Sequence, residues 1–269
     1  MLLRLTGAKV VFVCHDPEPH SWSLAERWRW LERMGYRLIY TCASQIIVLS
    51  ESGRAPLVRL FDVPPDKIVV SPHGAFDVPS AGPVPGSDTL LAFGTIRRNK
   101  QVALAMEAVV AARATGCPVR MVVAGAKDPN DPTYLDECEA IAARCPEGLT
   151  METGFIADER VNDLLAACDA LLMPYTDFNS QSGVAVMAGM AGRPVIAAPA
   201  GGIADLMASG LAAVEIPSPV NLEGVTQSIL EFYATPRAEW SDRADRGRVL
   251  LSQALAWPEI GRQLAQLLD

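Results

Sequence analysis

The sequence has little of what metal sites and disulfide frameworks are built from. Its 269 residues include only three histidines and six cysteines, and no two cysteines form a C-x-x-C pair. This scattered spacing argues against a zinc site and favours reduced thiols in a cytosolic compartment. The sequence therefore predicts no bound metal.

Long apolar runs and the best-known phosphate motifs are missing as well. No stretch approaches the roughly 20 apolar residues of a membrane-spanning helix, and the apolar start lacks a signal-peptide cleavage region. No G-x-G-x-x-G and no P-loop lysine motif is present, so neither a dinucleotide dehydrogenase nor an NTPase is indicated. We expect a cytoplasmic protein. The Trp/Arg segment at 21–40 leaves peripheral contact with the inner face of a membrane open.

An excess of positive charge is also absent. The net charge is −8, which gives no support for nucleic acid as a general partner and does not exclude a local basic pocket for phosphate. Half of the residues are hydrophobic and 20% are charged, as in folded globular proteins. The length suits two domains of ordinary size.

What the sequence does have is a regular alternation of apolar runs and helical patterns. Buried strands are predicted at "KVVFVC", "QIIVLS" and "KIVVSP", and from "TLLAFG" onward strand and helix alternate six times. Repeated strand–helix units predict an α/β fold with a Rossmann-like, doubly wound parallel sheet. The Pro/Gly/Ser-rich stretch near 77–88 predicts a linker between a domain at 1–76 and a second at 89–236, with helices at 237–269 closing the chain.

In such a sheet, ligands bind beyond the carboxyl ends of the strands. Three cations (Arg97, Arg98 and Lys100) lie at one strand–helix turn, glycines follow other strands, and Ser182–Gly183 opens a helix of small residues. Free amides and the dipole at a helix start favour an anion, so the pattern predicts a site for a phosphorylated ligand, plausibly a diphosphate. Each feature also has an ordinary alternative: a helix cap, a solvated turn, a turn glycine.

Several of these stretches together resemble a known family. "LLAFGTIRRNKQVALAMEAV", "VRMVVAG", "GFIADERVNDLLAACDALLMPY" and "QSGVAVMAGMAGRPVIAAPAGGIADL" resemble the nucleotide-sugar-binding domain of GT-B glycosyltransferases, specifically glycosyltransferase family 4, the group 1 glycosyltransferases. The likeness over 8–76 is weaker and resembles the second half of that family's first domain. The resemblance thus implies a GT-B protein with a truncated α/β N-terminal domain, whose unpaired edge an oligomer could cover.

The resemblance assigns roles to particular residues. Lys100 and Arg97 would contact the donor phosphates, and His15 falls near an acceptor-side histidine that could act as a base. The remaining donor-binding residues are expected to be Gly94, Gly125, Phe155, Ile156, Tyr175, Gln181, Ser182, Gly183 and Val184.

The implied function is a retaining glycosyltransferase that moves a sugar from a UDP- or GDP-linked donor to a glycan or lipid-linked acceptor in polysaccharide biosynthesis, with no further cofactor. Two positions depart from the family: Asn179 and Met187 stand where many members carry glutamates. The alternative is therefore a non-catalytic nucleotide-sugar-binding module or a subunit of a larger transferase. A third hypothesis, an unrelated Rossmann-type enzyme such as an epimerase, would need a different set of nucleotide contacts.

Overall fold

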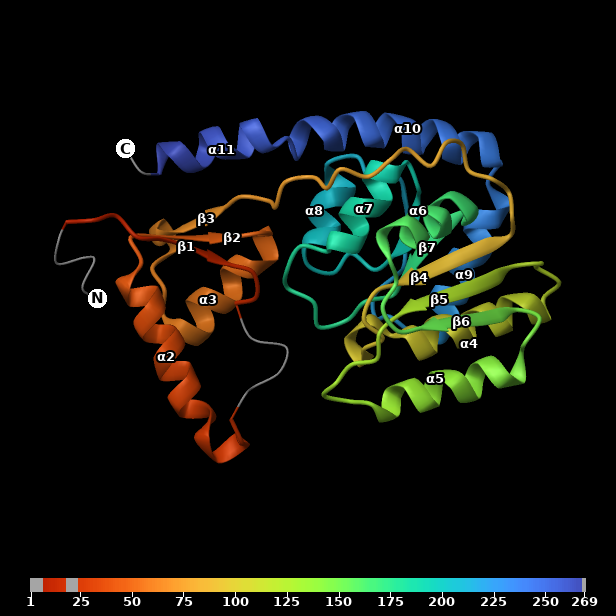
Figure 1. The fold of residues 1–269 in the computed structure, drawn as a ribbon, viewed down its shortest axis with the longest axis horizontal. Helices are drawn as coiled ribbons and strands as arrows, with labels where there is room; N and C mark the ends of the chain where they lie inside the picture. Colours follow the sequence, from red (N-terminus) through yellow and green to blue (C-terminus); the bar gives the residue numbers. More distant parts are fainter. Residues whose placement is uncertain (1–6, 18–23, 268–269) are drawn as a thin grey trace. The chain divides into compact units, whose positions relative to one another are not determined.

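The computed structural model describes residues 7–17 and 24–267, so Ser21–Ser23 of the Trp/Arg segment lie outside the described residues. The chain divides into two units (Figure 1). The first contains the residues up to Gly74 together with 179–182 and the segment from Leu255 onward, and the second contains 75–178 and 183–254. The chain therefore passes between the units four times, and the helices expected at 237–269 are shared between them.

The first unit is built on a three-stranded parallel sheet in the order β1-β2-β3. Its strands are β1 (Val11–Cys14), β2 (Gln45–Val48) and β3 (Ile68–Val70), and its helices are α2 (Arg29–Cys42), α3 (Arg54–Phe61) and α11 (Trp257–Gln266). Short 3₁₀ turns precede α2, α3 and β3 at Glu26–Trp28, Glu51–Gly53 and Pro65–Lys67. Alternate residues of the strands, among them Cys14, Ile46 and Ile68, pack with Tyr40, Leu57 and Phe61 from α2 and α3.

The second unit contains a six-stranded parallel sheet in the order β6-β5-β4-β7-β8-β9. Its strands are β4 (Thr89–Phe93), β5 (Arg120–Gly125), β6 (Leu149–Thr153), β7 (Ala170–Met173), β8 (Val195–Ala197) and β9 (Ala213–Glu215). All four residues of β7 and all three of β8 are buried. Central strands of a parallel sheet are covered on both faces, which explains why they are continuous apolar runs in the sequence.

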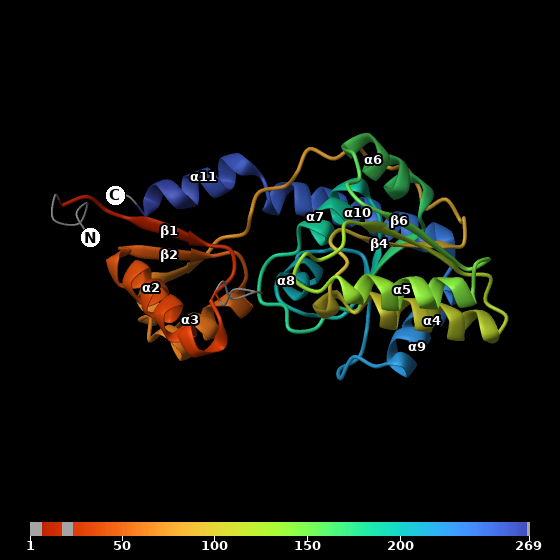
Figure 2. The same ribbon diagram turned by 60° about the horizontal axis from the view of Figure 1, so that its bottom comes forward.

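Helices cover both faces of this sheet. They are α4 (Val102–Ala114), α5 (Thr133–Arg144), α6 (Asp158–Ala167), α7 (Gly183–Ala191), α8 (Gly202–Ala208), α9 (Leu222–Ala234) and α10 (Arg237–Ala254). Figure 2 shows α4, α5 and α9 on one face and α6, α7 and α10 on the other. The predicted doubly wound α/β fold is therefore confirmed.

The sequences of these helices account for their positions. Seven residues of α4 are buried, because this helix lies between the sheet and α9 and needs an apolar surface almost all round. The start of α9 is fixed by Asn221, whose side chain accepts a hydrogen bond from the Gly224 amide at 2.8 Å. In α7 the small residues Ala185, Ala188 and Gly189 are buried, and a β-carbon on Gly189 would lie 2.4 Å from Leu251 of α10. The small residues thus allow close packing.

Candidate functional site

The order of the six strands reverses direction between β4 and β7. From β4 the chain continues to β5 and β6 on one side, then returns to place β7, β8 and β9 on the other. Such a switch point leaves a crevice beyond the carboxyl ends of the two central strands, where ligands of open α/β sheets bind. At this point the turn after β4 lies beside Tyr175 and Thr176, which follow β7: the Thr176 amide donates to the Asn99 carbonyl at 2.8 Å.

Two glycines allow the backbones to approach closely here. Gly94 follows β4 with φ of +96°, and its amide donates to the Ala124 carbonyl of β5 at 2.9 Å. A β-carbon on Gly125 would stand 2.0 Å from the Gly94 carbonyl oxygen, and one on Gly94 would stand 2.8 Å from the amine of Lys100 and 3.6 Å from Val184. Gly94, Lys100 and Val184 are therefore neighbours, as the predicted site requires.

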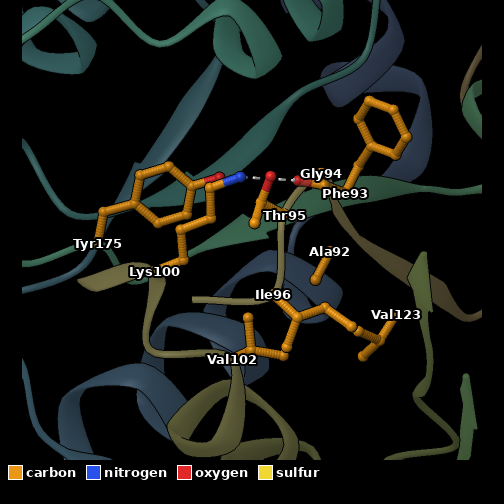
Figure 3. Close-up of a pocket in the computed structure, with 9 residues that line it drawn as sticks. All are labelled: Ala92, Phe93, Gly94, Thr95, Ile96, Lys100, Val102, Val123 and Tyr175. Atoms are coloured by element: carbon orange, nitrogen blue, oxygen red, sulfur yellow. Dashed lines mark hydrogen bonds between the residues drawn. The ribbon is translucent and has the colours of Figure 1, made fainter. Parts of the chain in front are cut away.

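Lys100 places its ammonium group in a confined space. The group lies 3.5 Å from the Phe93 carbonyl oxygen and 5.7 Å from the centre of the Tyr175 ring, in a cavity of about 10 Å³ (Figure 3). Burial, and then the positive charge of Arg97, lower the pKa of Lys100 from 10.5 to about 8. Among the described residues no carboxylate pairs with this amine in an ion pair. An anion at this point would restore the lysine's preference for its charged form.

The two arginines of the turn have different surroundings. Nε of Arg97 lies 3.0 Å from Oδ2 of Asp128, a buried carboxylate, although the two are not aligned as a hydrogen bond. Arg97 is also close enough to Lys100 to act on its pKa. Arg98 is exposed and instead pairs with Asp131, in the loop before α5, at 2.5 Å and with Glu137 of α5 at 3.0 Å. The structure thus brings Arg97 toward Lys100 and directs Arg98 away.

The start of α7 contributes the remaining positive potential. Its first residue, Gly183, is exposed, and a β-carbon there would meet the ring of Phe76 at 3.5 Å. The first amides of any helix have no partner within the helix. Because Val184 contacts the Gly94 position, these amides and the Lys100 amine lie in the same region. Nine residues make α7 long enough for its dipole to favour an anion.

Three more predicted residues lie at this edge of the sheet. Phe155 and Ile156 follow β6, and Phe155 is 91% exposed, which leaves its ring free to stack on a planar group. Tyr175 is buried with its ring below the lysine, and burial raises the pKa of its hydroxyl far above the usual range.

Gln181, Ser182 and His15 belong to the first unit. The side chain of Gln181 accepts from the His73 amide at 2.5 Å and donates to the His73 carbonyl at 3.3 Å. The Ser180 hydroxyl donates to the His15 carbonyl, and the His15 and His73 rings lie 6.4 Å apart. Ser182 is buried. The two hydrogen bonds of Gln181 therefore fix the backbone after β3. The residues around Gln181 in the sequence do not indicate this role.

The sequence analysis missed three residues in or beside the turn. Asp128 holds Arg97, and Gln101 donates through its side chain to the Thr176 hydroxyl at 2.9 Å. The Oδ1 atom of Asn99 is buried without a hydrogen-bond partner. Asn99 and Gln101 lie in the basic turn itself, so their polar side chains could have been included in the predicted site. Asp128 lies in a separate loop after β5, and no local pattern connects it to the turn.

Across residues 7–17 and 24–267, no cluster of three or more histidine, cysteine, aspartate or glutamate side chains could hold a metal ion. In the same ranges, no helix combines the length and apolar character needed to cross a bilayer.

A doubly wound parallel sheet with basic side chains and a helix start at its switch point is the arrangement of an α/β protein whose ligand site lies beyond the carboxyl ends of its strands. Residues 87–234 match the family model "Glycosyl transferases group 1", and residues 1–75 match "Glycosyltransferase Family 4". The chain belongs to the group 1 glycosyl transferases. The predicted family and enzyme class are therefore confirmed.

Solved structures agree with this fold. HepE from Anabaena, crystallised with UDP and glucose, has a TM-score of 0.75 at 18% identity, over 98% of this chain and 72% of HepE. Sucrose-phosphate synthase from Thermosynechococcus elongatus has a TM-score of 0.74 at 20% identity, over 96% and 66%. A glycosyltransferase from Rickettsia africae has a TM-score of 0.73 at 14% identity, over 98% and 71%. No curated protein sequence matches the chain.

Proposed function

We propose that this glycosyltransferase binds a nucleoside-diphosphate sugar at the carboxyl edge of its six-stranded sheet and transfers the sugar to a glycan or lipid-linked acceptor. The observation that carries the proposal is the amine of Lys100, which is desolvated beside Arg97 and Gly94 and has no carboxylate partner among the described ion pairs. A diphosphate supplies the missing negative charge. The UDP and UDP-glucose bound to HepE support this class of donor.

The chemistry would depend on the leaving group. Breaking the bond between the anomeric carbon and the diphosphate leaves additional negative charge on the phosphate oxygens. In this proposal Lys100, Arg97 and the amides of Gly183 and Val184 stabilise this charge, which is electrostatic catalysis. These cations could neutralise the diphosphate without a metal ion, so we propose that the UDP- or GDP-linked donor needs no further cofactor.

Retention of the anomeric configuration and a role in polysaccharide biosynthesis follow the family resemblance. The acceptor hydroxyl must lose a proton during transfer, and His15 in the first unit is our candidate for the group that receives it.

The experiment measures nucleotide release and sugar transfer with a panel of UDP- and GDP-sugars. Arg97→Ala and Lys100→Ala are expected to reduce turnover by about 10²-fold or more, since each removes a charge that acts on the transition state. Arg98→Ala is the matched control: Arg98 lies in the same turn but pairs with α5, so its loss should leave turnover within about twofold. Equal effects of all three variants would contradict the proposed site.

A second candidate function is a nucleotide-sugar-binding module without turnover. It is favoured by Met187, which occupies a helix position of α7 where many family members present a carboxylate and which cannot hydrogen-bond a ribose. Donor binding that depends on Lys100, with no transfer to any acceptor and no hydrolysis, would establish this function instead. Stabilisation by NAD, with none from UDP or GDP in a thermal-shift screen, would contradict both candidates.

A further inference from the structure

The loop after β5 contains a buried carboxylate, Asp128, to which the chemistry proposed above gives no part. Only 7% of this residue is exposed, and aspartates are rarely so buried unless they are paired. Its Oδ1 atom accepts hydrogen bonds from the Asn130 amide at 2.9 Å and from the Asn130 side chain at 3.3 Å. Its Oδ2 atom lies 3.0 Å from Nε of Arg97. One carboxylate oxygen is thus fixed by its own loop, and the other faces the arginine.

The backbone brings the two loops together. The Ile96 amide donates to the Ala126 carbonyl at 2.8 Å, and the Asp128 amide donates to the Ile96 carbonyl at 3.3 Å. Ile96 and Lys127 also form a parallel bridge, which continues the pairing of β4 and β5 beyond their ends. Arg97 and Asp128 each follow this bridge by one residue, so the pairing of the backbones sets them side by side.

Arg97 needs an attractive partner because its neighbour Lys100 repels it. The two side chains carry like charges, and they are close enough for Arg97 to affect the protonation of the lysine. The Arg97 side chain is 32% exposed, so solvent is open to it. Without a partner, we expect the guanidinium to turn toward water, where the repulsion is screened. Arg98 in the same turn has its own carboxylate partners away from Lys100.

We propose that Asp128 is a positioning residue, whose carboxylate holds Arg97 beside Lys100 before the donor binds, so that two cations already face the place of the diphosphate. The proposal rests on the proposed function, and Asp128 acts through Arg97 without touching the donor. The attraction of Asp128 for Arg97 offsets the repulsion between the two cations in the folded protein. The donor site is therefore preorganised for negative charge.

The first experiment compares the affinities of UDP and GDP for four variants by titration calorimetry. Asp128→Asn keeps the shape of the side chain and an oxygen for Asn130 but removes the charge. Loss of a negative charge would by itself strengthen binding of an anion, so weaker binding reports the displacement of Arg97. We expect affinity to fall about tenfold. In the Arg97→Met background the same substitution should change affinity by less than about twofold, because the two residues act as one unit.

Asp131→Asn is the matched control, because Asp131 lies in the same loop but pairs with Arg98. Its affinity for UDP and GDP should stay within about twofold of the wild type. Urea unfolding establishes that each variant is folded. A loss of affinity in Asp128→Asn that persists in the Arg97→Met background would assign Asp128 a purely structural role and overturn the proposal. Unchanged or tighter binding by Asp128→Asn would overturn it too.

The second experiment needs no nucleotide. Trace acetylation of the free protein at a series of pH values gives the pKa of Lys100, because only the neutral amine reacts. The sequence contains only four lysines, so mass spectrometry identifies the Lys100 peptide unambiguously. If Asp128→Asn releases Arg97 into solvent, the pKa of Lys100 should rise by about 0.5–1, as it should in Arg97→Met. The double variant should match Arg97→Met.

The two experiments separate this proposal from the proposed function. If the wild type bound neither UDP nor GDP, the proposed function would fail, whereas the acetylation experiment would still decide whether Asp128 holds Arg97 beside Lys100. A pKa of Lys100 that falls or stays unchanged in Asp128→Asn would mean that Arg97 keeps its place without the carboxylate. That result would overturn the positioning role even if the nucleotide binds.

Discussion

The amine of Lys100 lies 2.8 Å from the position that a β-carbon would occupy on Gly94. A glycine at the end of β4 therefore does two things: it adopts a φ of +96°, and it leaves room for the lysine. The space that a side chain would fill is part of the proposed diphosphate site.

Gly94→Ala is expected to weaken binding of UDP or GDP by about tenfold, because the new methyl group displaces the flexible end of Lys100. The backbone strain should cost only about 1–2 kcal/mol of unfolding free energy. Isothermal titration and urea unfolding measure the two effects separately. Unchanged affinity in the folded variant would place the diphosphate elsewhere.

Much of the fold could be predicted from the sequence, because the central strands of a parallel sheet are covered on both faces and so form continuous apolar runs. Ala170–Met173 and Val195–Ala197 are short, uninterrupted apolar runs, and the helix predicted from Gly183 to Ala191 has those bounds in the structure. The run "RVLLSQALAWPEIGRQLAQLLD" does not form one continuous helix. It is divided between α10 and α11, because Pro258 fits the first turn of a new helix but not the interior of an old one.

The site was readable only in part. The basic turn at Arg97–Lys100 is a local pattern. Its position at the carboxyl ends of the strands could therefore be predicted from the sequence. Which arginine lies beside Lys100 depends on partners distant in the chain, such as Asp128 for Arg97 and Asp131 for Arg98. The same is true of Gln181, whose partner His73 lies 108 residues away.

Gly125 is expected to tolerate no side chain. A β-carbon there would lie 2.0 Å from the Gly94 carbonyl oxygen and 2.6 Å from its carbon, so β4 and β5 would have to separate at their ends. Gly125→Ala should lower the unfolding free energy by about 3 kcal/mol or more, since rigid backbone cannot move aside. Urea unfolding at constant m-value measures the loss.

Gly154 provides the control for this substitution. It follows the neighbouring strand β6, also with positive φ, but nothing lies within 4 Å of its β-carbon position. Gly154→Ala should therefore cost only the backbone strain, about 1–2 kcal/mol. If both alanine variants lost the same stability, the close approach at Gly125 would not be the cause.

Gln181 is expected to act on the first unit and not on donor affinity. Its side-chain amide makes two hydrogen bonds to the His73 backbone, and Gln181→Ala leaves both groups unpaired. We expect a loss of about 1–2 kcal/mol in stability with an unchanged dissociation constant for UDP or GDP. Gln181→Glu keeps the acceptor but loses the donor, so its stability should be intermediate. A loss of nucleotide affinity without a loss of stability would return Gln181 to the donor contacts predicted from the sequence.

Lys100 should make both stability and nucleotide affinity depend on pH. Its pKa is about 8 in the folded chain and 10.5 when solvated, so between these values the unfolded state binds more protons. Stability therefore rises with pH through this window. Relative to Lys100→Met, the wild type should gain an unfolding free energy on the order of 2–3 kcal/mol between the two pH values.

Nucleotide binding should change with pH in the opposite direction. A bound diphosphate favours the charged lysine, so binding takes up protons above pH about 8 and affinity falls as the pH rises further. The diphosphate itself has finished titrating by then, because its last pKa is about 6. Titration calorimetry in two buffers of different ionisation enthalpy counts the protons taken up. In Lys100→Met the uptake should vanish, together with most of the affinity. Proton uptake that persists in this variant would show that another group, not Lys100, is linked to the diphosphate.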